Sequence, residues 1–274
     1  MKKIICPTDF STTANYAIEY AANLAKKLNA ELEILNVQIV SQVAPLASAV
    51  IAKEEHIAIN DKLQKICNEV KASFNITCNY SVELSTNTLE TAIGEKTDKD
   101  NLIVIGTNGA DDIYQYIFGT NSFNIIEKAK CPVLLLPHGT KYNGINKIVF
   151  SWDYSKDNRI SFNQMKALLK GFTPKVEFLH LSKGKTPLSD AVFNMFKDDI
   201  NTYLGGNEQI KYERLHIENE EDIPNTLDDY MNDANADLLA ITHYERGFFG
   251  NLFHGKVERD LSEMANYPLL VLHV

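Results

Sequence analysis

The sequence is poor in the features that mark several classes of protein. Its 274 residues hold 27 lysines and arginines against 36 aspartates and glutamates, a net charge of −9, so the basic surface of a nucleic-acid-binding protein is missing. No apolar run approaches the ~20 residues that span a bilayer. The opening MKKIICPTDF has an apolar run shorter than the about 7–15 residues of a signal peptide. We therefore expect a protein of the cytoplasm that binds neither nucleic acid nor membrane.

Cysteine is also scarce, and its spacing excludes the usual cysteine-based sites. The chain has four cysteines, none of them in a C-x-x-C pair: Cys6, Cys67, Cys78 and Cys131. Zinc sites and disulfide frameworks need tighter clusters, so we expect buried free thiols and no metal site. The sequence also lacks Ser-His-Asp, Cys-His and H-E-x-x-H arrangements, and no catalytic residue is predicted.

What the sequence does contain is a regular alternation of short apolar segments and helical segments. Strands are expected at Lys3 to Cys6, Glu31 to Val37, Ile76 to Leu84, Leu102 to Ile105 and Val133 to Leu136. The first helix has apolar residues at a 3.6-residue spacing, with Ser11 suited to cap its start and Asn29 to end it in a left-handed conformation. Strands that alternate with helices predict parallel βαβ units in a doubly wound sheet.

The second half of the sequence repeats the first. At a shift of 144 positions (147 − 3) the matching pairs are Lys147 with Lys3, Asp153 with Asp9, Ser155 with Ser11 and Glu177 with Glu33. At a shift of 136 (238 − 102) they are Leu238 with Leu102, Gly255 with Gly119 and Pro268 with Pro132. We therefore predict two tandem Rossmann-like α/β domains, residues 1–138 and 145–274. Each is expected to be a five-stranded parallel sheet, and we take its strand order to be 3-2-1-4-5.

A glycine-rich stretch follows the fourth predicted strand and reads GTNGADDIYQYIFGTNS from Gly106 to Ser122. Its glycines are spaced G-x2-G-x9-G. Glycine lets backbone amides approach a ligand closely, and amides at a strand-to-helix turn bind phosphate. In a doubly wound sheet the loops after strands 1 and 4 face each other where the strand order reverses, which brings Asp9 opposite the glycines. The pattern predicts a nucleotide site.

The second copy has lost this glycine pattern. Thr242 and Glu245 stand where the first copy has Gly106 and Gly109, and Gly255 alone is retained. A Cβ hinders close approach of the backbone, and Glu245 repels phosphate, so we expect the second copy not to bind ATP. Because the same fold is predicted there without the glycines, we also infer that the ligand, and not the fold, requires them.

Together these features resemble the universal stress protein family, in particular its ATP-binding branch. The resemblance rests on I-C-P-T-D-F-S at the start, L-N-V at the end of the second strand and G-x2-G-x9-G followed by Thr. It covers nearly the whole chain as two tandem copies. Members are cytoplasmic α/β proteins that act mainly as stress-linked nucleotide binders and associate through their fifth strands. The resemblance therefore implies that the two copies pair through their fifth strands, and that whole chains form a homodimer.

The resemblance also implies which residues bind ATP, either alone or with Mg²⁺ as a cofactor. The adenosine would be lined by Pro7, Thr8 and Asp9, and adenine would be contacted by the backbone of Val37. The ribose and phosphates would be surrounded by Gly106, Thr107 and Gly109. The phosphate oxygens would be bound by Gly119, Thr120, Asn121 and Ser122. Two alternatives stay open, because Asp9 also suits a turn or a helix cap and Val37 also suits the core. Asp111 and Asp112 repel a triphosphate unless they face solvent or share a Mg²⁺ ion.

Three functions are compatible with these observations. The first is an ATP-binding regulatory protein with at most slow ATP hydrolysis. The second is a related enzyme, an adenylyl transferase or a PP-loop ATPase. Such an enzyme would carry H-x-G-H or S-G-G-x-D-S near the first strand, where this chain has P-T-D-F-S. The third is a stress protein that binds no nucleotide and works through protein contacts. The intact glycine pattern of the first copy favours the first function.

Overall fold

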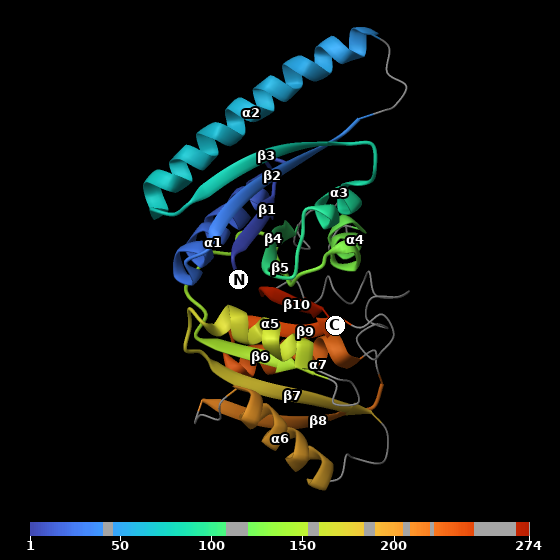
Figure 1. Cartoon of the computed structure of the whole chain (residues 1–274). Helices are drawn as coiled ribbons and strands as arrows, with labels where there is room; N and C mark the ends of the chain where they lie inside the picture. The colour runs from blue at the N-terminus through green and yellow to red at the C-terminus, as the bar shows by residue number, and fades with distance from the viewer. Residues whose placement is uncertain are drawn as a thin grey trace. The chain divides into compact units, whose positions relative to one another are not determined.

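The computed structural model describes residues 1–40, 46–107, 120–152, 159–183, 190–204, 209–219, 222–243 and 267–273 (Figure 1). The chain divides into two compact units, with the boundary between Tyr142 and Asn143. The described residues before it are called unit 1, and those after it unit 2.

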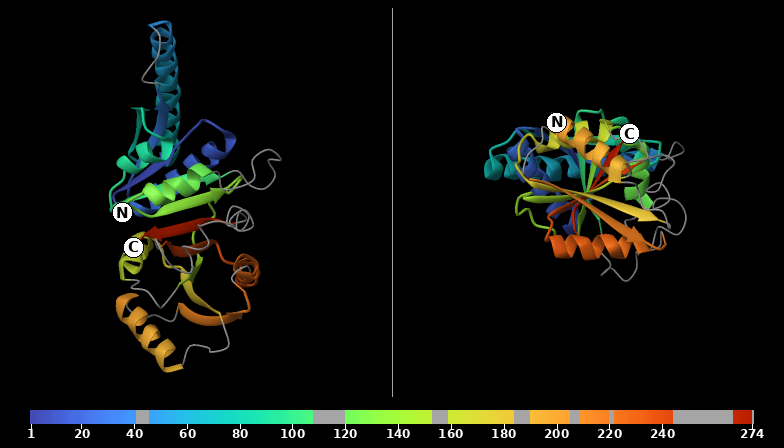
Figure 2. Two further views of the ribbon diagram at one scale, coloured as in Figure 1. Left: turned by 90° about the vertical axis from the view of Figure 1, so that its right-hand side faces the viewer. Right: turned by 90° about the horizontal axis from the view of Figure 1, so that it is seen from below.

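Unit 1 alternates strands and helices in the predicted order. Its elements are β1 (Lys3–Pro7), α1 (Thr12–Leu28), β2 (Glu31–Ile39), α2 (Leu46–Phe74), β3 (Cys78–Ser85), α3 (Leu89–Glu95), β4 (Asn101–Thr107), α4 (Thr120–Lys128) and β5 (Val133–Pro137). The strands are parallel and follow the order β3-β2-β1-β4-β5, which confirms the predicted order 3-2-1-4-5. Helices α1 and α2 cover one face of this sheet, and α3 and α4 cover the other (Figures 1 and 2).

Helix α1 forms where the sequence predicts because both of its ends are capped. The Ser11 hydroxyl accepts a hydrogen bond from the Ala14 amide at 3.1 Å, and Asn29 ends the helix in the left-handed conformation with φ 52°. Along the buried face, Ala17 and Ala21 are fully covered. Their small side chains let the helix come close to β1 and β4, which fixes the start of α1 beside the carboxyl end of β4.

Helix α2 packs against β3 through its carboxyl half. Leu63, Cys67 and Val70 are buried, whereas Ile57 is 52% exposed. The helix of 29 residues is far longer than its partner strand and reaches well past the sheet of unit 1 (Figure 2).

Unit 2 repeats the architecture of unit 1. Its elements are β6 (Lys147–Ser151), α5 (Arg159–Leu169), β7 (Lys175–Lys183), α6 (Asp190–Leu204), β8 (Ile210–Ile217), α7 (Ile223–Ala234), β9 (Leu238–His243) and β10 (Leu269–His273). The strands are parallel in the order β8-β7-β6-β9-β10, which is again 3-2-1-4-5 within the unit. Its core is aromatic, built around Phe150, Trp152 and Phe178.

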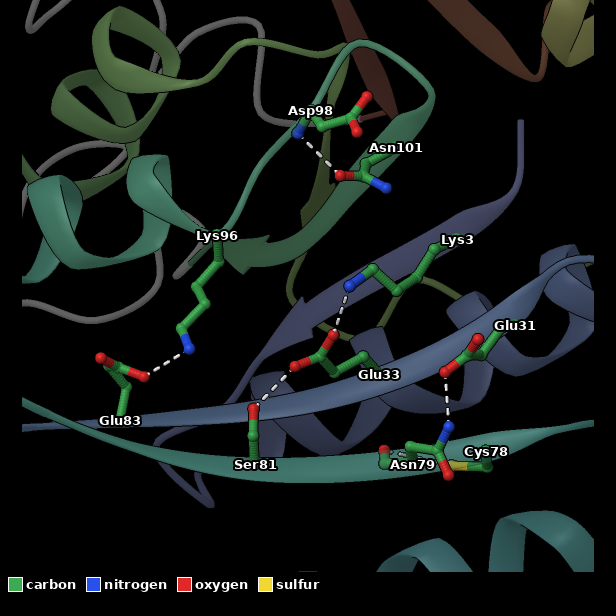
Figure 3. A network of polar contacts seen from close by, with 10 residues as sticks. All are labelled: Lys3, Glu31, Glu33, Cys78, Asn79, Ser81, Glu83, Lys96, Asp98 and Asn101. Atoms are coloured by element: carbon green, nitrogen blue, oxygen red, sulfur yellow. Dashed lines mark hydrogen bonds and ion pairs between the residues drawn. The ribbon is translucent and has the colours of Figure 1, made fainter.

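A polar network crosses the sheet of unit 1 (Figure 3). Lys3 of β1 donates to one carboxylate oxygen of Glu33 on β2 at 2.7 Å, and the Ser81 hydroxyl of β3 donates to the other at 2.7 Å. Burial raises the pKa of Glu33, but these contacts outweigh it and hold the pKa below its ordinary value. Unit 2 keeps the same ion pair between its first two strands, Lys147 with Glu177 at 2.7 Å. The pair therefore belongs to the repeated architecture.

The four cysteines are free and buried, as the sequence predicts. Burial raises the pKa of both Cys6 and Cys131 to about 12. Cys6 directly precedes the candidate site and is therefore a neutral thiol without nucleophilic character. Within the described ranges, no helix combines the length and the apolar character needed to cross a membrane.

Candidate functional site

The candidate site begins where β1 and β4 stop pairing. Strand β1 pairs with β4 only as far as Ile5 with Ile103, but with β2 as far as Pro7 with Leu35. The Thr8 amide donates to the Leu35 carbonyl at 2.8 Å. Because successive residues of a strand direct their backbone groups to alternate neighbours, Pro7 is directed toward β4. Proline has no N–H, so it cannot donate the next hydrogen bond to β4. The series of backbone hydrogen bonds between β1 and β4, called the ladder below, therefore ends here.

The ladder ends at the point where the strand order reverses. Strands β2 and β3 lie on one side of β1, and β4 and β5 lie on the other. In doubly wound sheets ligands bind beyond the carboxyl ends of the strands at this point. Six of the predicted site residues lie at the carboxyl ends of these three adjacent strands, β1, β2 and β4: Pro7, Thr8, Asp9, Val37, Gly106 and Thr107.

Val37 directs its backbone toward this edge. The Leu35 carbonyl points toward β1, so by the same alternation the N–H and C=O of Val37 point the same way, beyond the last residue of β1. The Thr8 carbonyl, the next acceptor in the ladder, instead accepts from the Asn36 side-chain amide at 2.8 Å. In the part of the chain that the structure describes, no backbone hydrogen bond joins Val37 to β1 or to the turn after it.

Asn36 is a site residue that the sequence analysis missed. The residue is 8% exposed, and its Oδ1 is buried without a hydrogen-bond partner among the described residues. A buried acceptor without a donor costs about 1–3 kcal/mol. The signal in the sequence was a polar amide within an apolar strand, one residue before Val37.

The turn after β1 is held by its own side chains. The Thr8 hydroxyl accepts from the Phe10 amide at 3.0 Å, and the Asp9 carboxylate accepts from the Ser11 amide at 2.9 Å. Between these contacts Phe10 takes a left-handed conformation with φ 66°, which is uncommon for a bulky residue. Asp9 is thus a turn-forming carboxylate, the alternative that the sequence left open. Its exposed side chain also remains within reach of a ligand.

Packing against α1 requires a glycine at position 106, in addition to the proposed contact with a ligand. A Cβ at this position would lie 2.7 Å from both Cγ2 and the backbone oxygen of Thr13, in the first turn of α1. The inference that the fold does not require the glycines is therefore wrong for Gly106. The neighbouring Thr107 hydroxyl donates to the Leu136 carbonyl at 3.2 Å, so it is used within the sheet.

The remaining predicted residues can be placed only in part. Gly109 and Gly119 lie outside the described residues, as do Asp111 and Asp112. Thr120, Asn121 and Ser122 form the first turn of α4, and their side chains also lie outside what the structure describes. The first backbone N–H groups of a helix have no partner within it, so α4 starts with donors next to the glycine stretch.

Unit 2 differs at the same edge. Ser151 occupies the position of Pro7 and has an N–H, and β6 accordingly pairs with β9 as far as Ser151 with Ile241. The ladder between the first and fourth strands thus continues two residues further than in unit 1 (151 − 144 = 7, against 5). Trp152 occupies the position of Thr8 and is 2% exposed, with its ring centre 6.1 Å from that of Phe178. Unit 2 therefore lacks the early end of the ladder and has a bulky indole beside it.

Comparison with known proteins agrees with these observations. A family model described as the universal stress protein family matches residues 1–137. A universal stress protein of Methanocaldococcus jannaschii is 30% identical over 149 residues, which cover 49% of this chain and 81% of the relative. A putative universal stress protein of Staphylococcus epidermidis is 28% identical over 141 residues, which cover 49% of this chain and 83% of the relative.

The fold also matches that of a solved structure. The crystal structure of a universal stress protein from Archaeoglobus fulgidus superposes with a TM-score of 0.73 at 16% identity, covering 99% of this chain and 96% of that one. The family match spans 137 of the 274 residues, half of the chain. The chain belongs to the universal stress protein family.

Proposed function

We propose that the protein binds an adenine nucleotide, ATP, at the carboxyl edge of unit 1 and acts as a nucleotide-binding regulatory protein of the stress response. The observation that carries the proposal is the early end of the ladder between β1 and β4, caused by Pro7. The unpaired Oδ1 of Asn36 and the backbone of Val37 lie at the same edge. The end of the pairing between β1 and β4 therefore coincides with donors and acceptors that a ligand could satisfy.

Adenine carries groups that complement these positions. Its exocyclic amino group donates hydrogen bonds and its ring nitrogens accept them, while Val37 offers one backbone N–H and one C=O. The buried Oδ1 of Asn36 needs a donor, which an amino group supplies. The glycine stretch between β4 and α4 would provide amides for the phosphates. Mg²⁺ would offset the repulsion between a triphosphate and the carboxylates of Asp9, Asp111 and Asp112.

The two copies would then have different roles. Residues 1–138 would form the nucleotide-binding domain, and residues 145–274 a structural or regulatory partner without ATP. Pairing of the copies through β5 and β10, a homodimer of whole chains and a location in the cytoplasm are parts of the same proposal. Four buried free thiols suit a reducing compartment. No catalytic residue is assigned, and slow hydrolysis is the most activity that the proposal includes.

The bound ligand can be identified directly. The purified chain is heat-denatured and the released small molecules are identified by mass spectrometry, with ATP or ADP expected. A Gly109→Glu variant, which imitates Glu245 of the second copy, should lose the nucleotide while its circular dichroism spectrum stays unchanged. The control is Gly255→Glu, which makes the same substitution at the one glycine that the second copy retains, the counterpart of Gly119, and it should keep the nucleotide. Release of no nucleotide by the wild type, or retention by Gly109→Glu, would contradict the proposal.

A further inference from the structure

Two histidines lie side by side at the carboxyl edge of unit 2. His243 is the last residue of β9 and His273 the last of β10, and the two are paired in register. Residues paired in this way project to the same face of the sheet. The centres of the two imidazole rings are 5.8 Å apart and the ring planes meet at 61°. His243 is buried, with 6% of its surface exposed.

The equivalent positions of unit 1 hold no imidazole. At the shift of 136 positions His243 and His273 correspond to Thr107 and Pro137, which are also paired in register. The same fold thus forms with a threonine and a proline at these positions. The repeated fold therefore does not require imidazoles at these positions.

A buried hydroxyl lies on the same face of the same edge. Ser151 ends β6 and is paired in register with Ile241, two residues before His243, so both side chains project to one face. Ser151 is fully buried, and its hydroxyl has no hydrogen-bond partner among the residues described. Unit 1 has Pro7 at this position. Unit 2 has thus replaced two prolines and a threonine at this edge by a serine and two histidines.

We propose that His243 and His273 bind one divalent transition-metal ion of the zinc, nickel and copper class. Imidazole nitrogen is a preferred ligand of these ions. With metal–nitrogen distances of about 2.1 Å, two imidazoles on one tetrahedral ion have ring centres about 5 Å apart, which is close to the 5.8 Å between the ring centres of His243 and His273. The Ser151 hydroxyl would accept or donate a hydrogen bond to a water molecule on the ion.

The site would be weaker than a structural zinc centre. In the described ranges no group of three histidine, cysteine, aspartate or glutamate side chains could hold a metal, so two imidazoles are the protein ligands assigned here and water completes the coordination. Structural zinc sites have four protein ligands. We therefore expect micromolar affinity. The proposal concerns unit 2 alone and does not depend on nucleotide binding in unit 1.

Metal titration tests the proposal. The full chain, without a histidine tag and stripped with a chelator, is titrated with Zn²⁺ by isothermal titration calorimetry, and one ion per chain is expected. His243→Thr, which installs the residue of unit 1, and His273→Ala should each weaken binding at least tenfold. The matched control is His216→Ala, an exposed histidine on β8, which should bind as the wild type does.

A second measurement keeps the test valid if the variants fail to fold. Saturating Zn²⁺ should protect His273, which is more exposed than His243, from modification by diethyl pyrocarbonate, located by mass spectrometry, while His216 stays reactive. Absence of Zn²⁺ binding by the wild type would overturn the proposal. So would equal affinity in the wild type and both variants, a loss of binding in His216→Ala as large as in the other two, or a failure of Zn²⁺ to protect a His273 that is modified without it.

Discussion

Replacement of Gly106 by alanine tests whether packing of α1, as well as a ligand, requires this glycine. The new Cβ would lie 2.7 Å from Cγ2 and 2.7 Å from the backbone oxygen of Thr13. Thr13 is buried, so the contact can be relieved only by moving the first turn of α1 away from β4.

The expected cost follows from two opposing effects. Overpacking a buried contact costs about 1–3 kcal/mol. Alanine also restricts the unfolded chain, which returns about 0.4–1 kcal/mol. The free energy of unfolding of unit 1 should therefore fall by about 1–2 kcal/mol, which corresponds to a midpoint shift of about 0.5–1 M urea.

Urea unfolding followed by two signals measures this effect. Far-UV circular dichroism reports on both units, whereas fluorescence reports on unit 2, because the chain has 1 tryptophan and Trp152 is buried there. A second substitution, Thr13→Ser, removes Cγ2 but keeps the hydroxyl that contacts His138 Nδ1 at 2.7 Å. Because the clash with the backbone oxygen remains, it should restore about half of the loss.

Two results would show that contact with Thr13 does not require glycine at position 106. If Gly106→Ala unfolds at the same urea concentration as the wild type, the contact with Thr13 does not constrain this position. If Thr13→Ser restores nothing in the double variant, the cost does not come from the Cγ2 contact. Gly139→Ala is the control for backbone conformation alone, since Gly139 has φ 74° and no atom within 4 Å of an added Cβ.

Three further predictions concern acid stability, the ladder and assembly. Glu33→Gln should lower the free energy of unfolding by about 1–3 kcal/mol at neutral pH. The pKa of Glu33 is lowered in the folded state. The stability that ionised Glu33 contributes is therefore complete above its pKa in the unfolded chain, about 4.3, and is lost as the pH falls through its pKa in the folded chain. Urea unfolding midpoints of the wild type and Glu33→Gln should therefore converge in acid. Pro7→Ser supplies the missing N–H toward β4. Calorimetry should show that the variant binds ATP at least tenfold more weakly, while its free energy of unfolding stays within about 1 kcal/mol of the wild type. Unchanged affinity would show that ATP binding does not depend on the early end of the hydrogen bonding between β1 and β4. Light scattering should give a mass twice that of the 30.9 kDa chain, and a mass equal to one chain would exclude the homodimer.

Local signals in the sequence predicted the elements well. The serine before α1 and the asparagine after it mark its two ends, because capping depends on the side chains of adjacent residues. The alternation of strands and helices and the internal repeat predicted two parallel sheets, whereas the strand order 3-2-1-4-5 was a premise that these two patterns do not determine. Strand ends were less accurate: β2 continues to Ile39, two residues past the predicted end, because Gln38 and Ile39 pair with β3, a contact that local sequence does not encode.

The parts of the site that were missed depend on contacts between distant elements. In the fold itself, a Cβ at Gly94 of α3 would lie 2.6 Å from the backbone oxygen of Lys128 in α4, so this glycine permits close packing of two helices that are distant in the sequence. Pro7 was predicted as a lining residue, but its effect on the ladder depends on which neighbour its backbone faces. His243 and His273 are 30 positions apart (273 − 243), and only the strand order brings them together.

Titration of the full chain with MgATP tests most directly the claim that unit 1 binds nucleotide and unit 2 does not. Isothermal titration calorimetry counts the sites per chain. We expect one site per chain, absent in Gly109→Glu and unchanged in Gly255→Glu. Two sites per chain, or a single site that persists in Gly109→Glu, would contradict it.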